Sequence, residues 1–390
     1  MKNLSVYIHV PFCKRKCSYC DFVSVSKPHE YQEKYIDALV LEITSSQKLS
    51  ESHNLNTIYI GGGTPSYLNE ALLEKLLVAI GNVYNLATVK EYTFECNPES
   101  VSEDKFRLLK KYGVNRISFG LQSTNDEELL ALRRSHDFKT FLDSYALARK
   151  IGFKNISVDL MFSIPGQSMD SLGETLKNIV EIAPEHISCY SLIVEENTLM
   201  NRWVNEGKIC LHTDDEYVDM YRLVTDFLEK KDYTQYEISN FSKKGYESIH
   251  NKAYWIRDNY LGLGVAAHSL IDDRRFANIE NIDDYMEKIE DMESPVSPDS
   301  VEKLTPSDIV NEMIFLGLRM NQGIEVAIIK EQIKKTHERH GPALEAAAIF
   351  DTKIHKLCKA NLLEIQDNRI SLTQKGREIS NTVFAELMVD

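Results

Sequence analysis

Residues 5–20 read SVYIHVPFCKRKCSYC, a short β-rich run followed at once by three cysteines within eight positions. The alternation of apolar and polar residues over Ser5–Val10 predicts a strand, so Cys13, Cys17 and Cys20 fall in the loop at its carboxyl end. Three neighbouring thiolates favour a bound metal. A structural zinc ion would need a fourth ligand from elsewhere in the chain, whereas an iron–sulfur cluster can be held by three cysteines with one iron left open.

Five further β-rich runs alternate with segments whose apolar residues recur three and four positions apart. The six predicted strands are Ser5–Val10, Thr57–Ile60, Tyr92–Glu95, Arg116–Phe119, Ile156–Met161 and His186–Leu192. The predicted helices are Glu30–Ser46, Glu70–Gly81, Glu103–Tyr112, Phe141–Ile151 and Ser168–Ala183. This order predicts an α/β fold with helices covering a parallel sheet. Six units are too few for a closed eight-stranded barrel, so we expect an open, partial (β/α)6 barrel with all carboxyl strand ends on one rim.

The alternation of strand and helix patterns ends near Tyr236, and the glycine-containing stretch beyond it looks neither regularly helical nor regularly β. Ser294–Ser300 carries two prolines and reads as a linker. Two helical patterns follow it, and then two short β runs separated by a turn, an order that favours a winged-helix-like fold. These segments are Asp308–Arg319, Ile324–Thr336, Leu362–Ile365 and Ile370–Leu372. We therefore divide the chain into a barrel (1–235), a connecting subdomain (236–295) and a C-terminal winged-helix-like domain (296–390).

Composition excludes several classes of function. The chain has 390 residues, 43% of them hydrophobic, and 59 acidic against 45 basic side chains give a net charge of −14, so nucleic acid is not an expected partner. No apolar run approaches the roughly 18 residues of a membrane span, and the first residues lack the features of a signal peptide. Seven cysteines, an odd number, favour reduced thiols over a disulfide framework. We expect a cytoplasmic protein that is not integral to a membrane.

Further polar and glycine residues fall at successive predicted strand ends. The run Gly61–Pro65 follows the second strand, Glu95 ends the third, Gln122 follows the fourth and Asp159 lies in the fifth. Each alone is commonly a tight turn, a helix cap or a solvated carboxylate. Because the glycines lack side chains and all these positions share one rim, together they favour a ligand lying across it.

The Cys-x3-Cys-x2-Cys loop, with Tyr19 just before its last cysteine and the glycine run downstream, resembles that of radical S-adenosylmethionine proteins. Over most of its length, C-terminal domain included, the chain is similar to the anaerobic coproporphyrinogen oxidase family. This resemblance implies that Cys13, Cys17 and Cys20 hold a 4Fe-4S cluster whose open iron chelates the amino and carboxylate groups of S-adenosylmethionine. It also implies the following contacts to S-adenosylmethionine: Tyr7, Tyr19, Gly62, Gly63, Thr64, Glu95, Gln122, Arg134 and Asp159.

Two features indicate a branch within that family. The oxidase branch carries another cysteine two residues after the third ligand, where this chain has Phe22, and residues 250–255 read HNKAYW. Both resemble the heme chaperone branch, which implies binding of heme b and its transfer to acceptor apo-hemoproteins, respiratory enzymes among the candidates. His250 is the expected axial ligand and Tyr254 and Trp255 a porphyrin wall, although simple packing is the alternative; His268 has a comparable claim.

Two other classes of function remain open from the sequence. One is an enzyme, an oxygen-independent coproporphyrinogen III oxidase that decarboxylates propionates through an adenosyl radical. The other is a zinc-stabilised interaction protein. The residue at Phe22 favours the chaperone over the oxidase, and whether S-adenosylmethionine is cleaved stays open.

Overall fold

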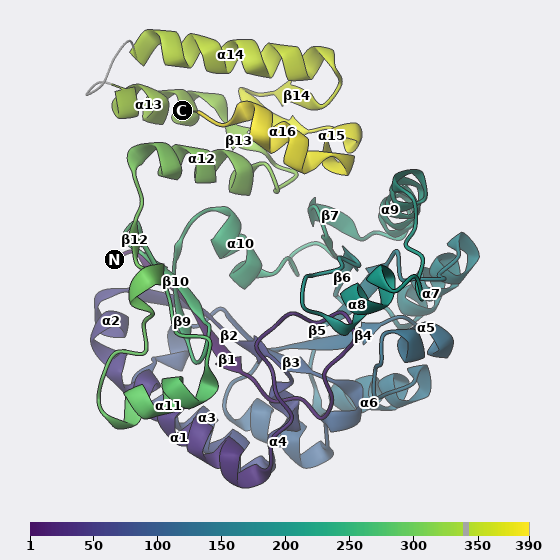
Figure 1. Ribbon diagram of the computed structural model, residues 1–390, viewed down its shortest axis with the longest axis vertical. Helices are drawn as coiled ribbons and strands as arrows, with labels where there is room; N and C mark the ends of the chain where they lie inside the picture. Colours follow the sequence, from purple (N-terminus) through teal and green to yellow (C-terminus); the bar gives the residue numbers. More distant parts are fainter. Residues whose placement is uncertain (338–342, 390) are drawn as a thin grey trace.

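The six predicted β runs form six neighbouring parallel strands in chain order in the computed structural model, which describes residues 1–337 and 343–389. They are β1 (Asn3–Val10), β2 (Asn54–Gly62), β3 (Glu91–Cys96), β4 (Arg116–Gln122), β5 (Asn155–Phe162) and β6 (His186–Ser191). The expected partial barrel is confirmed (Figure 1). Because the strands are parallel, their carboxyl ends, and with them the cysteine loop, share one rim.

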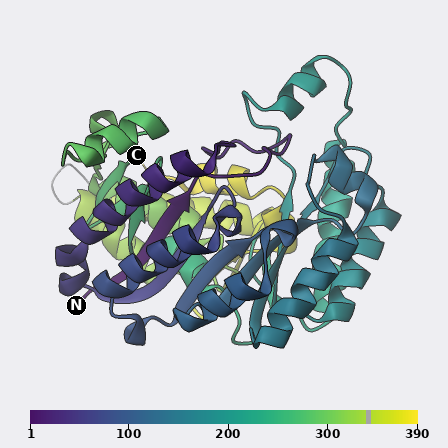
Figure 2. The ribbon, with the colours of Figure 1, turned by 90° about the horizontal axis from the view of Figure 1, so that it is seen from below.

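Amphipathic helices cover the outer face of this sheet, and the purple and blue helices lie in front of it in Figure 2. The longer ones are α1 (His29–Ser45), α3 (Glu70–Val83), α4 (Glu103–Lys111), α6 (Phe138–Ile151), α7 (Met169–Ile182) and α9 (Asp214–Glu229). Shorter helices are α2 (Gln47–Ser52), α5 (Asp126–Ala131), α8 (Leu199–Asn205) and the 3-10 turns η1 (Pro65–Tyr67), η2 (Leu86–Thr88) and η3 (Pro98–Ser100). Alternate strand residues such as Val6, Ile8 and Ile58 are fully buried against these helices. The intervening positions are polar and face the barrel interior.

The stretch after Tyr236 was expected to be irregular, and that expectation is wrong. It contains β7 (Thr234–Glu237), β8 (Asn240–Ser242), α10 (Ile249–Trp255), β9 (Asn259–Leu263), β10 (His268–Ile271), β11 (Arg274–Ala277), α11 (Ile282–Glu290) and β12 (Glu302–Lys303). Strand β8 pairs antiparallel with β6, and β9 pairs parallel with β1 at the opposite edge, giving the order β12-β11-β10-β9-β1-β2-β3-β4-β5-β6-β8-β7. Residues of the expected connecting subdomain thus extend both edges of the main sheet.

The C-terminal domain has its own apolar core and stands at one end of the molecule (Figure 1). After η4 (Pro298–Ser300) it comprises α12 (Pro306–Gly317), β13 (Ile324–Glu325), α13 (Val326–His337), α14 (Ala343–Lys359), β14 (Leu363–Gln366), β15 (Arg369–Leu372), α15 (Gln374–Glu378) and α16 (Ser380–Leu387). The predicted hairpin is β14 and β15, and β13 adds a third strand. The predicted helix at Ile324 begins instead at Val326, because its first two residues pair with β15. Within the described residues, no helix is long and apolar enough to cross a membrane.

Candidate functional site

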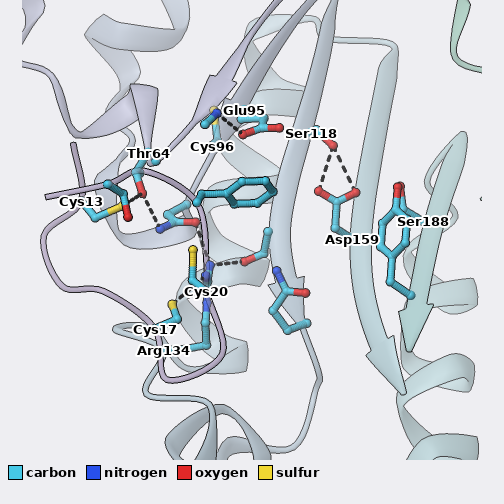
Figure 3. Close-up of a pocket in the computed structure, with 18 of the residues that line it drawn as sticks. Cys13, Cys17, Cys20, Thr64, Glu95, Cys96, Ser118, Arg134, Asp159 and Ser188 are labelled. Atoms are coloured by element: carbon cyan, nitrogen blue, oxygen red, sulfur yellow. Dashed lines mark hydrogen bonds between the residues drawn. The ribbon is translucent and has the colours of Figure 1, made fainter. Parts of the chain in front are cut away.

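The rim of the barrel encloses a cavity of about 410 Å³ between the cysteine loop and the strand ends (Figure 3). All of the site residues predicted from the sequence line it except Tyr7 and His250. Those that do are Cys13, Cys17, Tyr19, Cys20, Gly62, Gly63, Thr64, Glu95, Gln122, Arg134 and Asp159. Residues from the first loop and from strands β2 to β5 therefore meet in one place, as the shared rim of a parallel sheet predicts.

Backbone hydrogen bonds fix the cysteine loop on the rim. The Cys13 amide donates to the Val25 carbonyl (3.0 Å), and the Ser18 amide donates to the Leu132 carbonyl (3.2 Å). The Met200 amide at the start of α8 donates in turn to the Ser18 carbonyl (2.8 Å). A bond within the loop and two other connections of the barrel thus hold the loop, whose three thiols remain partly exposed.

The donor set of this loop fits an iron–sulfur cluster. Burial raises the pKa of the Cys13 thiol and raises that of Cys20 to about 11, so deprotonation there needs a bound cation or metal. Among the described residues, no three histidine, cysteine or carboxylate side chains lie close enough together to hold one metal ion. A four-iron cluster attaches each thiolate to a different iron, so it suits thiols spaced more widely than the ligands of a single zinc ion.

Two partly buried carboxylates face the cavity from different strands of the sheet. Glu95 accepts hydrogen bonds from the Tyr59 hydroxyl (2.7 Å) and the Gly62 amide (3.2 Å), and burial raises its pKa to about 7. Asp159 accepts from the Ser118 hydroxyl (3.1 and 3.2 Å to its two oxygens), and burial raises its pKa as well. A ligand that presents an ammonium or hydroxyl donor would stabilise the ionised form of both carboxylates.

The glycine run packs against this chain's own atoms. A Cβ on Gly61 would lie 2.8 Å from the Glu95 carboxylate, one on Gly62 would lie 2.4 Å from the His9 ring, and one on Gly63 would lie 2.9 Å from the Phe12 backbone. The side-chain direction of these glycines is thus filled by this chain's own atoms, while the backbone of Gly62 and Gly63 lines the cavity. The missing side chains let β1, the cysteine loop and β3 approach the turn after β2.

Tyr7 lies outside the cavity lining. Its hydroxyl is hydrogen-bonded to Nδ1 of His9 (2.9 Å), and its ring packs against Tyr59 with centroids 6.2 Å apart. Nε2 of His9 meets the Val23 carbonyl (2.9 Å). His9 is thus a buried, hydrogen-bonded core residue, and Tyr7 packs behind the cavity-lining Tyr59.

His250 is 1% exposed, and both of its ring nitrogens are engaged. Nδ1 lies 2.7 Å from the Thr57 hydroxyl and Nε2 lies 3.0 Å from the Tyr254 hydroxyl, while the backbone amide donates to Glu91 (3.0 Å). Burial lowers the pKa of His250 to about 3, so the ring is neutral. No ring nitrogen is free for a heme iron in this arrangement, and the prediction of an axial ligand at His250 does not fit it. The alternative, packing, does.

Trp255 ends α10 on the side of the C-terminal domain. Its ring lies under the Arg319 guanidinium, 4.4 Å from the ring centroid, a cation–π contact between the barrel and α12's downstream loop. Ser248, the N-cap of this helix, and Asn251, within the helix, line the cavity. The HNKAYW segment therefore contributes Asn251 to the cavity wall, and not the histidine or the tryptophan.

Asn97 is a cavity residue that the sequence analysis missed. It directly follows β3, and its side chain joins Thr64 to Arg134 through hydrogen bonds of 3.1 and 2.7 Å. A signal was available, because a polar residue just beyond a strand end was the criterion that selected Gln122.

Comparison with known proteins agrees with this architecture. Residues 7–179 match the sequence model of the Radical SAM superfamily and residues 304–379 that of the HemN C-terminal domain. The solved structure of coproporphyrinogen III oxidase (HemN) from Escherichia coli covers 100% of this chain and 90% of its own, with a TM-score of 0.83 and 23% identity, which establishes the shared fold. The fold and the cysteine-lined rim thus define a radical SAM protein.

Relatives similar over their full length narrow the assignment. The chain is 34% identical to the heme chaperone HemW of Bacillus subtilis, over 98% of this chain and 99% of that one. It is also 34% identical to the heme chaperone HemW of Lactococcus lactis, over 100% of this chain and 98% of that one. The chain belongs to the HemW family.

Proposed function

We propose that the protein is a heme chaperone that binds heme b and passes it to acceptor hemoproteins, and that it carries a 4Fe-4S cluster and S-adenosylmethionine. The observation that carries this proposal is the full-length similarity to relatives named heme chaperones. Phe22 supports it, because this residue stands where the oxidase branch of the wider family has a further cysteine. The Phe22 side chain is 61% exposed at the cavity mouth and offers an apolar surface to a porphyrin.

Cys13, Cys17 and Cys20 are the proposed cluster ligands. When bound, a cluster of this kind supplies the electron that can cleave the sulfonium of S-adenosylmethionine. In this proposal Glu95 and Asp159 accept hydrogen bonds from the amine and ribose hydroxyls of that cofactor, and Gln122 and Tyr19, which line the same cavity, also contact it. The partial burial of the two carboxylates strengthens such hydrogen bonds.

For the heme iron we propose His268 as the ligand, since both nitrogens of His250 are occupied. His268 begins β10 and is exposed, and its ring has no hydrogen bond to any other described residue. The backbone carbonyl oxygen of His268 lies close to Gly262: a Cβ on Gly262 would be 2.3 Å from this oxygen. Gly262 in turn pairs with Tyr7 of β1, next to the strand that leads into the cysteine loop.

The test is an anaerobic heme titration of reconstituted protein, followed through the Soret band. Wild type should bind about one heme per chain, and His268→Ala should shift the Soret band or weaken binding at least tenfold. His250→Gln keeps a hydrogen-bonding side chain in the core and should retain the wild-type spectrum. His355→Ala, an exposed histidine on α14, is the matched surface control. A wild type that binds no heme contradicts the chaperone assignment, whereas a normal His268→Ala spectrum contradicts only the choice of ligand.

Activity on coproporphyrinogen III separates the chaperone from the oxidase. The loaded protein, incubated anaerobically with coproporphyrinogen III, a reductant and S-adenosylmethionine, should leave this compound unchanged. Catalytic formation of protoporphyrinogen, measured by chromatography of the oxidised porphyrins, would overturn the proposal in favour of an enzyme.

A further inference from the structure

A continuous chain of hydrogen bonds connects two of the three loop cysteines (Figure 3). The Thr64 hydroxyl contacts Sγ of Cys13 at 3.4 Å, and Nη1 of Arg134 contacts Sγ of Cys17 at 3.4 Å. Asn97 lies between them: its Nδ2 is 3.1 Å from the Thr64 hydroxyl and its Oδ1 is 2.7 Å from Nη2 of Arg134. We call Thr64, Asn97 and Arg134 the donor chain.

The chemistry of these groups fixes the direction of every hydrogen bond in the donor chain. A guanidinium only donates, so the atom of Asn97 that faces Arg134 must be the amide oxygen. The amide nitrogen of Asn97 then faces Thr64 and donates to its hydroxyl oxygen. Because a hydroxyl has one proton, and its oxygen already accepts from Asn97, that proton is left to point at Sγ of Cys13.

Neighbouring contacts hold the donor chain rigidly. The backbone amide of Asn97 donates to the Ser66 hydroxyl (3.1 Å). The Ser100 hydroxyl and the Ser100 backbone amide both donate to the backbone carbonyl of Asn97 (2.9 and 3.0 Å). Arg134 is buried and also donates to the Gly120 carbonyl (2.6 Å). These contacts fix the Asn97 backbone and the Arg134 guanidinium, and so keep the Asn97 side chain between Thr64 and Arg134.

We infer that Asn97 is a positioning residue that directs one hydrogen-bond donor at each of two cluster thiolates. This inference rests on the proposed cluster. A donor to a thiolate withdraws electron density from the sulfur and makes the attached iron easier to reduce, so the donor chain raises the reduction potential of the cluster. Cys20 has a backbone contact at Phe22 in place of a side-chain donor, so the three ligands are unequal.

Asn97→Asp tests the direction of the donor chain with almost no change of shape. A carboxylate has no proton to give, so the Thr64 hydroxyl would donate to the introduced carboxylate and turn its lone pairs toward Cys13. Arg134 would keep its acceptor. The cluster of Asn97→Asp should therefore be harder to reduce, with at least a tenfold change in the ratio of reduced to oxidised cluster at a fixed potential, or 59 mV for a one-electron couple. The measurement is an EPR-monitored redox titration without S-adenosylmethionine.

The added charge of Asn97→Asp is separated from the lost donor by a double-mutant cycle. Thr64→Val removes the same proton without adding charge and should shift the potential in the same direction, whereas Thr64→Ser keeps a hydroxyl and should retain the wild-type value. In the Thr64→Val background, Asn97→Asp should have a smaller effect than in wild type, because the donor is already gone. Iron–sulfur stretching frequencies in resonance Raman spectra should rise in both single variants, and iron and sulfide content should be unchanged.

The outcomes separate this role from the proposed function. An unchanged potential in Thr64→Val, or fully additive shifts in the cycle, would overturn the donor chain and leave the cluster assignment intact. A wild type that takes up no cluster under reconstitution would contradict the proposed function, and the inference with it. A purely structural brace would alter cluster retention in Thr64→Val without moving the potential of the cluster that remains, and that result also counts against the inference.

Discussion

Glu95 is a carboxylate whose protonation depends on the folded state. Its oxygens lie within hydrogen-bonding distance of Tyr59 and Gly62, yet burial raises its pKa from 4.5 to about 7. Between these two values the unfolded chain is ionised while the folded protein holds the proton. The stabilising contribution is therefore fully present below about pH 4.5 and is lost as pH rises through 7.

The first prediction follows from this decrease of stability with rising pH. In cluster-free protein, the free energy of unfolding of wild type should fall by about 3 kcal/mol relative to Glu95→Gln between pH 4.5 and pH 8. Urea unfolding at a series of pH values measures it. Glu103→Gln is the control: its exposed carboxylate has a pKa lowered by hydrogen bonding to Arg107, so it should follow the wild-type curve above pH 5. Parallel curves for wild type and Glu95→Gln would show that Glu95 stays ionised.

At the scale of elements, the turn after β2 and the start of the cysteine loop are held together through Gly63. The Gly63 amide donates to the Val10 carbonyl (2.9 Å), and the next amide, that of Thr64, donates to the Phe12 carbonyl (2.8 Å). A Cβ on Gly63 would be 2.9 Å from both N and O of Phe12, which are backbone atoms and cannot rotate away. Strand β2 thus positions Cys13 directly.

Gly63→Ala is accordingly predicted to displace the loop. We expect a loss of about 1–3 kcal/mol in the free energy of unfolding, the usual cost of overpacking, and a lower iron content after reconstitution. Gly173 in α7 is the matched control, because a Cβ there meets nothing within 4 Å. Gly173→Ala should be neutral or stabilising by up to about 1 kcal/mol, with full iron content. Equal iron content in both variants would contradict the role of Gly63.

The elements of the barrel could be predicted because each carries its own pattern. Val6, Ile8 and Val10 alternate with polar residues, and this alternation alone marks β1 and its buried face. Strand β9 could not be found in that way. Gly262 interrupts its pattern, and the partner that makes it a strand, β1, lies about 250 residues earlier in the chain.

The same distinction holds at the site. Cavity residues that follow strand ends were predictable, since parallel strands place those ends on one rim. The burial of His250 was not, because it depends on Thr57, a residue from a distant strand. Asn97 had the right position, but its function comes from the partners on either side of it, Thr64 and Arg134, which only the folded chain brings together.

At the scale of the whole molecule, the buried carboxylate of Glu312 is one of the groups that join the C-terminal domain to the barrel; Glu378 of α15, paired with Arg222 of α9 (2.7 Å), is another. Glu312 of α12 accepts from Nε of Arg257 (2.6 Å) and from Nη2 of Arg275, both on the barrel side. Arg257 also pairs with Asp273 (2.9 Å). The side chain of Glu312 is 5% exposed, so the carboxylate and the two guanidinium groups compensate one another away from water.

Glu312→Gln should therefore weaken the junction of the two parts. The variant leaves two arginines beside a neutral amide, and loss of one partner of a buried ion pair costs about 3 kcal/mol or more. We expect a lower urea midpoint and faster proteolytic cleavage in the predicted linker, Ser294–Ser300. Iron content should be unchanged, because the cysteine loop lies on the rim of the barrel and does not contact Glu312.

Glu386→Gln, which breaks the exposed pair with Lys356 within the C-terminal domain, is the control and should change the free energy of unfolding by less than about 1 kcal/mol. If Glu312→Gln and Glu386→Gln were cleaved at the same rate as wild type, the two parts would be held together by other contacts, such as the Arg222–Glu378 pair (2.7 Å) and the Arg319–Trp255 contact, and not by this ion pair.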